Sequence, residues 1–154
     1  LFNIKLDKIQ ITIHPQSIVH SMVEFVDGSY KAHLGLPDMK VPIQYALTFP
    51  ERKDSSVGSL DFENLNLDFK KPDLERYPIL SLVEELINLG GNRLAVMSMA
   101  NDYVVQKFLD QKISFNEIFF LITEVVDKFA SDDLPSLEEL FTLDKNIQLY
   151  LNPN

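Results

Sequence analysis

His14-Pro15-Gln16-Ser17-Ile18-Val19-His20-Ser21-Met22 is the stretch that organises this chain, and it holds two of the three histidines and two serines within nine residues. The proline ring fixes the φ angle of Pro15 and disfavours a helical conformation at His14. We therefore expect a turn here, at the end of a strand. Polar turns with titratable side chains are frequent positions for binding and catalytic sites.

The residues on either side of this stretch predict a small sheet. Residues 8–14 alternate between isoleucine and polar side chains, which is typical of a half-buried strand ending at His14. Residues 19–26 and 29–35 flank Asp27-Gly28, a dipeptide that favours a two-residue hairpin turn. We expect these three strands to form a mixed or antiparallel sheet.

A helix and an irregular segment are expected after the hairpin. Asp38 can cap a helix that runs to about Leu47, with Pro42 in its first turn, where a missing N–H is tolerated. Pro50 ends this helix, and a polar loop follows. Alternating apolar residues within 60–69 then indicate a short strand.

The second half of the chain has the pattern of amphipathic helices. After Pro72 the apolar period changes from two residues to about 3.6. Gly90-Gly91 closes the first helix, and capping boxes of serine and glutamate open the last two. The helices are expected from Pro78, over 92–110, from Ser114 with Glu117 and from Ser136 with Glu139 to about Tyr150. In the second helix, the side chains expected to face the core are Leu94, Met97, Ala100, Val104 and Phe108.

These elements together predict an α+β fold. We expect a small sheet with a β-hairpin, followed by a C-terminal four-helix bundle in which each helix buries its apolar stripe against the others. The change of period places the boundary near residues 70–77, so that residues 1–70 and 71–154 form two domains.

The composition excludes several classes of protein. The chain of 154 residues has 45% hydrophobic residues and no cysteine, which excludes disulfides and thiolate metal sites. Its net charge of −9 at pH 7 argues against nucleic acids and anionic membranes as main partners. No apolar run approaches the roughly 18 residues that a membrane span needs.

The candidates for chemistry are few, and each has a structural alternative. His14, His20 and His33 could bind a metal, but their spacing matches no zinc motif. Ser17 and His20 could act as nucleophile and base, but no G-x-S-x-G motif accompanies them, and both could instead bond to the backbone of a tight turn. The sequence contains no glycine-rich phosphate loop or dinucleotide fingerprint.

The chain resembles the 1-deoxy-D-xylulose 5-phosphate reductoisomerase family over nearly its whole length. The stretch from His14 to Met22 is similar to the family signature H-P-Q-S-x-x-H-S-M. Further blocks follow in the family's order: Leu34-Gly35-Leu36-Pro37-Asp38-Met39, Pro42-Ile43, Ala46-Leu47-Thr48-Phe49-Pro50-Glu51-Arg52, Leu60-Asp61-Phe62, Pro72-Asp73, Arg76-Tyr77-Pro78, Ala100-Asn101, Phe108-Leu109 and Ile113-Ser114-Phe115-Asn116-Glu117-Ile118. The chain departs from the family at Ile79, where a cysteine is usual, and at Asp102, where a glutamate is usual.

The resemblance implies an enzyme of isoprenoid biosynthesis that works in two stages. A divalent metal, Mg²⁺ or Mn²⁺, holds the substrate oxygens while the carbon skeleton rearranges, and NADPH then reduces the aldehyde to 2-C-methyl-D-erythritol 4-phosphate. In the family, the NADPH fingerprint and the metal-ligand motifs lie in segments that this sequence does not contain. We therefore assign no catalytic residue, metal ligand or NADPH contact to this chain, and expect neither cofactor to bind it alone.

The resemblance also implies a partial substrate pocket. By match to the family's motifs, Ser17 and His20 border the phosphosugar substrate, and Pro37 with Met39 form the apolar side of its pocket. Residues 1–70 then correspond to the end of the central, catalytic domain, and 71–154 to the C-terminal helical domain. Because the family is dimeric through its central sheet, the sheet region of this chain is expected to contribute to a homodimer interface.

We interpret the chain as a fragment, because it begins at Leu1, in the middle of a pattern. A metal-dependent enzyme without its ligands loses its main electrostatic stabilisation, so the fragment should be inactive alone. The alternative is a stand-alone interaction module that keeps the fold without catalysis. The parent enzyme is expected in the cytoplasm or, in a eukaryote, in a plastid-type organelle.

Overall fold

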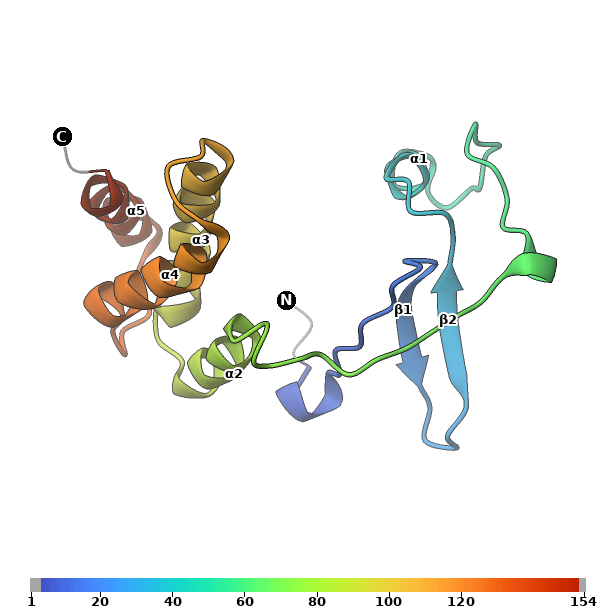
Figure 1. Cartoon of the computed structure of the whole chain (residues 1–154), viewed down its shortest axis with the longest axis horizontal. Coiled ribbons are helices and arrows are strands. Elements are labelled where there is room, and N and C mark those ends of the chain that lie inside the picture. Colours follow the sequence, from blue (N-terminus) through green and yellow to red (C-terminus); the bar gives the residue numbers. More distant parts are fainter. Residues whose placement is uncertain (1–3, 153–154) are drawn as a thin grey trace. The chain divides into compact units, whose positions relative to one another are not determined.

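The computed structural model describes residues 4–152 and divides the chain into two compact units, Leu1–Pro72 and Asp73–Asn154 (Figure 1). Its strands and α-helices are β1 (Val19–Glu24), β2 (Tyr30–Leu34), α1 (Lys40–Thr48), α2 (Ile79–Leu89), α3 (Arg93–Leu109), α4 (Phe115–Phe129) and α5 (Leu137–Leu151). The predicted α+β fold is therefore confirmed. In the described part of the chain, no helix combines the length and the apolar character that crossing a bilayer requires.

β1 and β2 form the predicted hairpin, but the pair of Phe25 and Ser29 closes a loop of three residues, 26–28, rather than two. Phe25 N–H donates to Ser29 O (2.9 Å), and Gly28 N–H donates to Phe25 O (3.0 Å). These bonds describe a turn followed by Gly28 in the left-handed conformation (φ +79°), a common form of three-residue loop. Asp27 Oδ1 accepts hydrogen bonds from the hydroxyl and the backbone N–H of Ser29, which lowers the pKa of Asp27.

The prediction of a strand over residues 8–14 is wrong. In the described chain the sheet has two strands, β1 and β2. Only Ile13 pairs, through an isolated antiparallel bridge to Lys70, and Ile9 and Ile11 are more than half exposed. The alternating pattern is compatible with a strand, but a strand also needs a continuous partner. The described residues provide that partner only at Lys70.

The helix predicted to begin near Asp38 is present as α1, whereas the short strand predicted within 60–69 is absent from this described stretch. Asp38 Oδ1 accepts a hydrogen bond from Lys40 N–H (2.9 Å), one of the free donors at the start of the helix. A 3-10 turn at Phe62–Asn64 replaces the strand. Local bonds to the side chain of Asp61 compete there with strand pairing.

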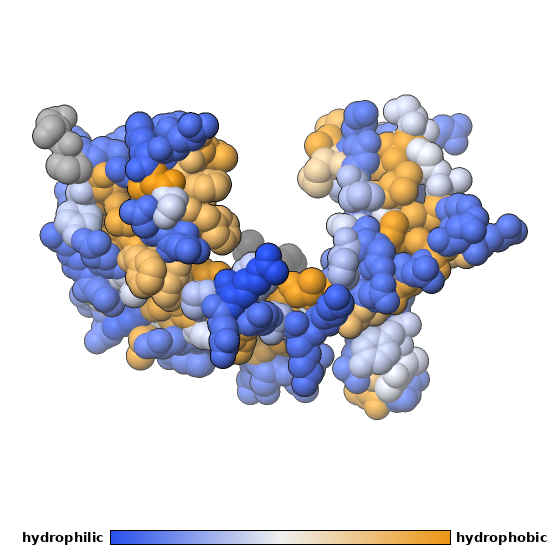
Figure 2. Space-filling view, viewed as in Figure 1, coloured by the Kyte–Doolittle hydropathy of each residue, from blue (hydrophilic) through white to orange (hydrophobic). Residues whose placement is uncertain are grey.

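The first unit has almost no hydrophobic core. Ile18 is the only buried hydrophobic residue among residues 4–72. Met39, Leu47 and Phe49 are 70%, 83% and 70% exposed, and Figure 2 shows apolar residues at the surface of the molecule. Because burial of apolar surface is the main favourable contribution to folding, this unit needs further protein surface to become stable.

The second unit is a helical bundle with a continuous core, and α3 contacts each of the other three helices. Val96, Ala100 and Val104 lie at positions i, i+4 and i+8 of α3 and are completely buried. The core consists of Leu86, Val96, Ala100, Val104, Ile122, Val125, Val126, Ile147 and Leu151. The predicted bundle is therefore present, although Leu94 is exposed because α3 turns the face around Ala100 toward its neighbours.

Both predicted capping boxes are present at the starts of α4 and α5. Ser114 N–H donates to Glu117 Oε2 (2.7 Å), and Ser136 N–H donates to Glu139 Oε2 (2.8 Å). These backbone bonds, together with bonds from the serine hydroxyls, hold the pKa of both glutamates below its usual value. Each helix start is thus fixed by residues within one turn of sequence.

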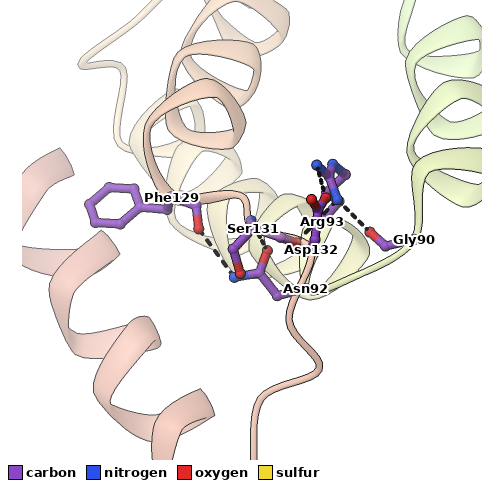
Figure 3. A network of polar contacts seen from close by, with 6 residues as sticks. All are labelled: Gly90, Asn92, Arg93, Phe129, Ser131 and Asp132. Atoms are coloured by element: carbon purple, nitrogen blue, oxygen red, sulfur yellow. Dashed lines mark hydrogen bonds and ion pairs between the residues drawn. The ribbon is translucent and has the colours of Figure 1, made fainter.

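Asn92 ties the start of α3 to the end of α4. It is the one buried polar residue of the described chain, at 8% exposed. Its Nδ2 donates to Phe129 O (3.1 Å), its Oδ1 accepts from Ser131 N–H (2.7 Å), and its backbone N–H donates to Ser131 O (3.1 Å) (Figure 3). These partners offset the desolvation of the buried amide.

Arg93 extends the same connection to the turn between α2 and α3. Its Nη1 donates to Gly90 O and to Ser131 O (both 3.1 Å), and its Nη2 pairs with Asp132 (2.7 Å) (Figure 3). Gly91 lies in this turn with φ +65°, and a Cβ added to it would lie 2.1 Å from Ser131 O. Only glycine therefore allows the two backbone segments to approach so closely.

We expect Gly91→Ala to destabilise the helical unit by about 1–3 kcal/mol more than Gly90→Ala. Both replacements strain a backbone with positive φ, but only the Cβ at Gly91 overlaps the backbone of Ser131, whereas nothing lies within 4 Å of a Cβ at Gly90. Urea unfolding followed by circular dichroism measures the difference. Equal destabilisation by the two variants would contradict the close-approach argument.

We expect residues 73–154 to fold when produced alone, and residues 1–72 to remain unfolded. The first polypeptide contains the whole nine-residue core, while the second, over its described residues, buries only Ile18. Thermal unfolding by circular dichroism should be cooperative for the helical polypeptide and absent for the other. A cooperative transition in residues 1–72 would show that the hairpin unit is stable by itself.

Candidate functional site

The turn predicted at Pro15 is present, and it places Ser17 in an unusual backbone conformation. Ser17 N–H donates to His14 O (3.0 Å) and closes the turn. Ser17 has a φ of +53°, in the left-handed region that few residues other than glycine adopt. Such conformations persist only where the surroundings enforce them, and they cluster at functional sites. Ser17 is exposed.

His14 supports the turn from its other side. Its Nδ1 lies 2.8 Å from Asp68 O, and its ring stacks on Phe69 with the centroids 4.8 Å apart. Because a carbonyl oxygen only accepts, Nδ1 carries a proton and donates this bond, and Nε2 is the other ring nitrogen. In the described chain this Nε2 is buried without a hydrogen-bond partner. His14 thus serves the packing of the turn.

His20 occupies a β-bulge in the hairpin. Val19 pairs with Leu34 and Ser21 pairs with His33, so His20 is the extra residue of β1. Its ring meets the ring of His33 edge to face, with the centroids 5.9 Å apart. Both histidines are exposed. A bulge commonly redirects one side chain of a strand, and here it brings together two imidazoles from neighbouring strands.

The segment that carries Pro37 and Met39 lies beside the stretch from Ser17 to His20. Gly35 N–H donates to Ile18 O (3.0 Å), and a Cβ added to Gly35 would lie 3.8 Å from His20 Nε2. Pro37 and Met39 follow within the connection from β2 to α1, and both are exposed. The structure therefore joins the two segments at Gly35 and leaves the four predicted pocket residues accessible.

The described residues do not form a metal site by themselves. Among residues 4–152, no three histidine, aspartate or glutamate side chains lie close enough to hold one metal ion. His20 and His33 are adjacent, but they provide only two ligands, while His14 is bonded to Asp68.

A hollow beside the hairpin was not predicted from the sequence. Its volume is about 340 Å³, and it is lined by His33, Val41, Pro42, Tyr45, Ala46 and Arg52. The Arg52 guanidinium lies over the Tyr45 ring, 3.9 Å from its centroid. In a chain of net charge −9 this arginine provides a local positive charge. The block Ala46–Arg52 of the family resemblance contains Arg52, but a motif alone does not show that it folds back onto Tyr45.

Asp61 of the L-D-F block has a structural role. Its carboxylate accepts hydrogen bonds from Asn64 Nδ2 (2.8 Å) and from Glu63 N–H (3.1 Å). The bond from the Asn64 side chain is the main cause that lowers the pKa of Asp61, and the Glu63 backbone contributes next. Asp61 therefore fixes the 3-10 turn after α1.

Comparison with known proteins identifies the family. Residues 34–150 match the family described as the DXP reductoisomerase C-terminal domain, where DXP is 1-deoxy-D-xylulose 5-phosphate. The chain belongs to this family. The match contains Pro37 and Met39, while Ser17 and His20 precede it.

Longer relatives also match the residues before this domain. The 1-deoxy-D-xylulose 5-phosphate reductoisomerase of Chloroherpeton thalassium is 46% identical over 152 residues, which are 98% of this chain and 39% of that protein. The reductoisomerase of Zymomonas mobilis is 44% identical over 150 residues, 97% of this chain and 39% of that protein. The chain thus spans about two fifths of the length of these relatives.

Solved structures agree with this assignment. The Zymomonas mobilis reductoisomerase in complex with NADPH matches with a TM-score of 0.85 and 43% identity, over 97% of this chain and 40% of that chain. A reductoisomerase in complex with NADPH, fosmidomycin and magnesium matches with a TM-score of 0.86 and 37% identity, over 97% and 39%. The resemblance inferred from the motifs is confirmed.

Proposed function

We propose that this chain forms the C-terminal part of a 1-deoxy-D-xylulose 5-phosphate reductoisomerase. The enzyme would convert this phosphosugar to 2-C-methyl-D-erythritol 4-phosphate with NADPH and Mg²⁺ or Mn²⁺, in isoprenoid biosynthesis. The carrying observation is that reductoisomerases match 97–98% of the chain at 44–46% identity. The rest of such a protein would supply the NADPH-binding domain and the metal ligands, because the described residues contain no cluster able to hold a metal.

In this proposal the chain provides one wall of the substrate pocket. Ser17 and His20 border the substrate, where a hydroxyl and an imidazole can donate hydrogen bonds to phosphate or hydroxyl oxygens. Pro37 and Met39 form the apolar side, against the carbon chain of the sugar. Three features support this placement: the exposure of all four residues, the left-handed Ser17, and the contact between the two segments at Gly35.

The remaining assignments concern the organisation of the whole enzyme. We place residues 1–70 at the end of its catalytic domain and residues 71–154 in its C-terminal helical domain. The enzyme would act as a homodimer through its sheet, since each strand of the two-stranded ladder keeps an edge without a described partner strand. It would work in the cytoplasm, or in a plastid-type organelle of a eukaryote.

We expect Ser17→Ala in the whole enzyme to raise the KM for 1-deoxy-D-xylulose 5-phosphate by about ten- to a hundredfold, with little change in kcat. Loss of one hydrogen bond to a charged group has a free energy of roughly 1.5–3 kcal/mol, and uniform binding energy appears in KM. Steady-state NADPH oxidation measures both constants. Ser98→Ala replaces an exposed serine of α3 and serves as the control. An unchanged KM in Ser17→Ala would remove this residue from the pocket.

We expect the 154-residue chain alone to show no NADPH oxidation that depends on 1-deoxy-D-xylulose 5-phosphate, because its described residues lack a complete metal site. The assay is run with added Mg²⁺ or Mn²⁺. Substrate-dependent oxidation by the chain alone would contradict the proposal that other domains are needed.

An immunoblot of source cells adds a second check, since a native protein of only 17.7 kDa would favour an interaction module instead.

A further inference from the structure

A second segment, residues 68–70, holds the turn that carries Ser17. Ile13 N–H donates to Lys70 O (2.8 Å), and Lys70 N–H donates to Ile13 O (2.9 Å). Together with the bond from His14 Nδ1 to Asp68 O, these contacts bring the two segments together across more than 50 residues of sequence. The polypeptide before the turn is therefore fixed to Asp68 and Lys70.

Gln16 and Asp68 extend this contact into the turn itself. Gln16 Nε2 donates to Asp68 Oδ2, and Asp68 N–H donates to Gln16 Oε1 (3.3 Å). Both ends of the carboxamide are thus engaged by one residue. A two-point contact of this kind fixes the orientation of a side chain as well as its distance, and the ionised acceptor strengthens it.

Ser17 lies between two fixed neighbours. Gln16 is bound to Asp68 on one side, and Ile18 on the other side is the buried hydrophobic residue of the described part of the first unit. Ser17 itself is exposed and has the strained φ of +53°. A left-handed serine relaxes to a more favourable conformation unless its surroundings prevent it. With Ile18 buried, the Gln16–Asp68 contact is the side-chain restraint directly next to Ser17 on the N-terminal side, in addition to the backbone bond from Ser17 N–H to His14 O.

We propose that Asp68, acting through Gln16, is a positioning residue that holds Ser17 in the left-handed conformation in which its hydroxyl faces the substrate. The inference rests on the proposed pocket role of Ser17 and adds to it a residue that no motif of the resemblance contains. Asp68 does not touch the substrate in this proposal. Its effect on catalysis passes through the backbone of the turn.

The test compares Gln16→Glu with the double variant Gln16→Glu/Asp68→Asn in the whole reductoisomerase. In Gln16→Glu, two carboxylates face each other and the contact opens. In the double variant the carboxamide and the carboxylate exchange places, so that the new carboxamide at position 68 donates to the new carboxylate at position 16. The backbone N–H of residue 68 also keeps an acceptor. We expect the KM for 1-deoxy-D-xylulose 5-phosphate to rise about tenfold in the single variant and to return to within about threefold in the double variant, with kcat nearly constant.

A matched control is available in the same unit. Asn64 Nδ2 donates to Asp61 Oδ2 (2.8 Å), which is the same pairing of carboxamide and carboxylate, and the hydrogen bonds found for the Asp61 carboxylate stay within residues 61–64. Asn64→Asp creates the same repulsion and should leave KM unchanged. Thermal unfolding of every variant identifies any general loss of folding. Equal increases of KM in Asn64→Asp and Gln16→Glu would overturn the inference, because the effect would then be one of stability.

The outcomes also separate this inference from the proposed function. If the wild-type enzyme does not turn over the substrate, the proposed function fails and the inference fails with it. If Ser17→Ala raises KM but Gln16→Glu does not, the pocket assignment stands and the positioning role of Asp68 is wrong. A raised KM in Gln16→Glu that the double variant does not restore would also contradict the role of the Gln16–Asp68 contact. A KM that returns toward the wild-type value in the double variant supports the role of this contact.

Discussion

The uneven burial of apolar side chains is the constraint on which the rest of this structure depends. The core cluster lies within the helical unit, whereas the described part of the hairpin unit buries only Ile18. The hairpin unit therefore depends mainly on hydrogen bonds, each of which contributes a net free energy of only about 1 kcal/mol. The residues assigned to the substrate belong to this unit. Under the proposed function, the geometry of the site thus depends on protein surface from outside these residues.

Within the hairpin unit, local irregularities of the backbone determine where the side chains of the site lie. The left-handed backbone exposes Ser17 beside the buried Ile18, and the bulge in β1 turns His20 toward His33. The hydrogen bond from Gly35 to Ile18 then joins this stretch to the next one. The left-handed residue and the bulge both deviate from regular secondary structure. Such deviations are common where a protein must present a side chain rather than bury it.

The sequence predicted best those features whose causes lie within a few residues of each other. Ser114 and Glu117 form their capping box because both partners belong to one helical turn. The strand over 8–14 was wrong because periodicity describes the faces of a segment and not its partner. At the site, the family resemblance named Ser17, but neither its φ nor its restraint by Asp68 could be read from the sequence, since the contact that restrains it spans 52 positions.

The bulge at His20 has a consequence for how this hairpin can change in evolution. Side chains alternate along a strand, so inserting or deleting one residue between the bulge and the loop would turn every following side chain of β1 to the opposite face. A substitution, in contrast, alters one side chain and leaves the pairing intact. Descendants of this chain can therefore vary the identity of residues in the hairpin more freely than the number of residues between His20 and the loop.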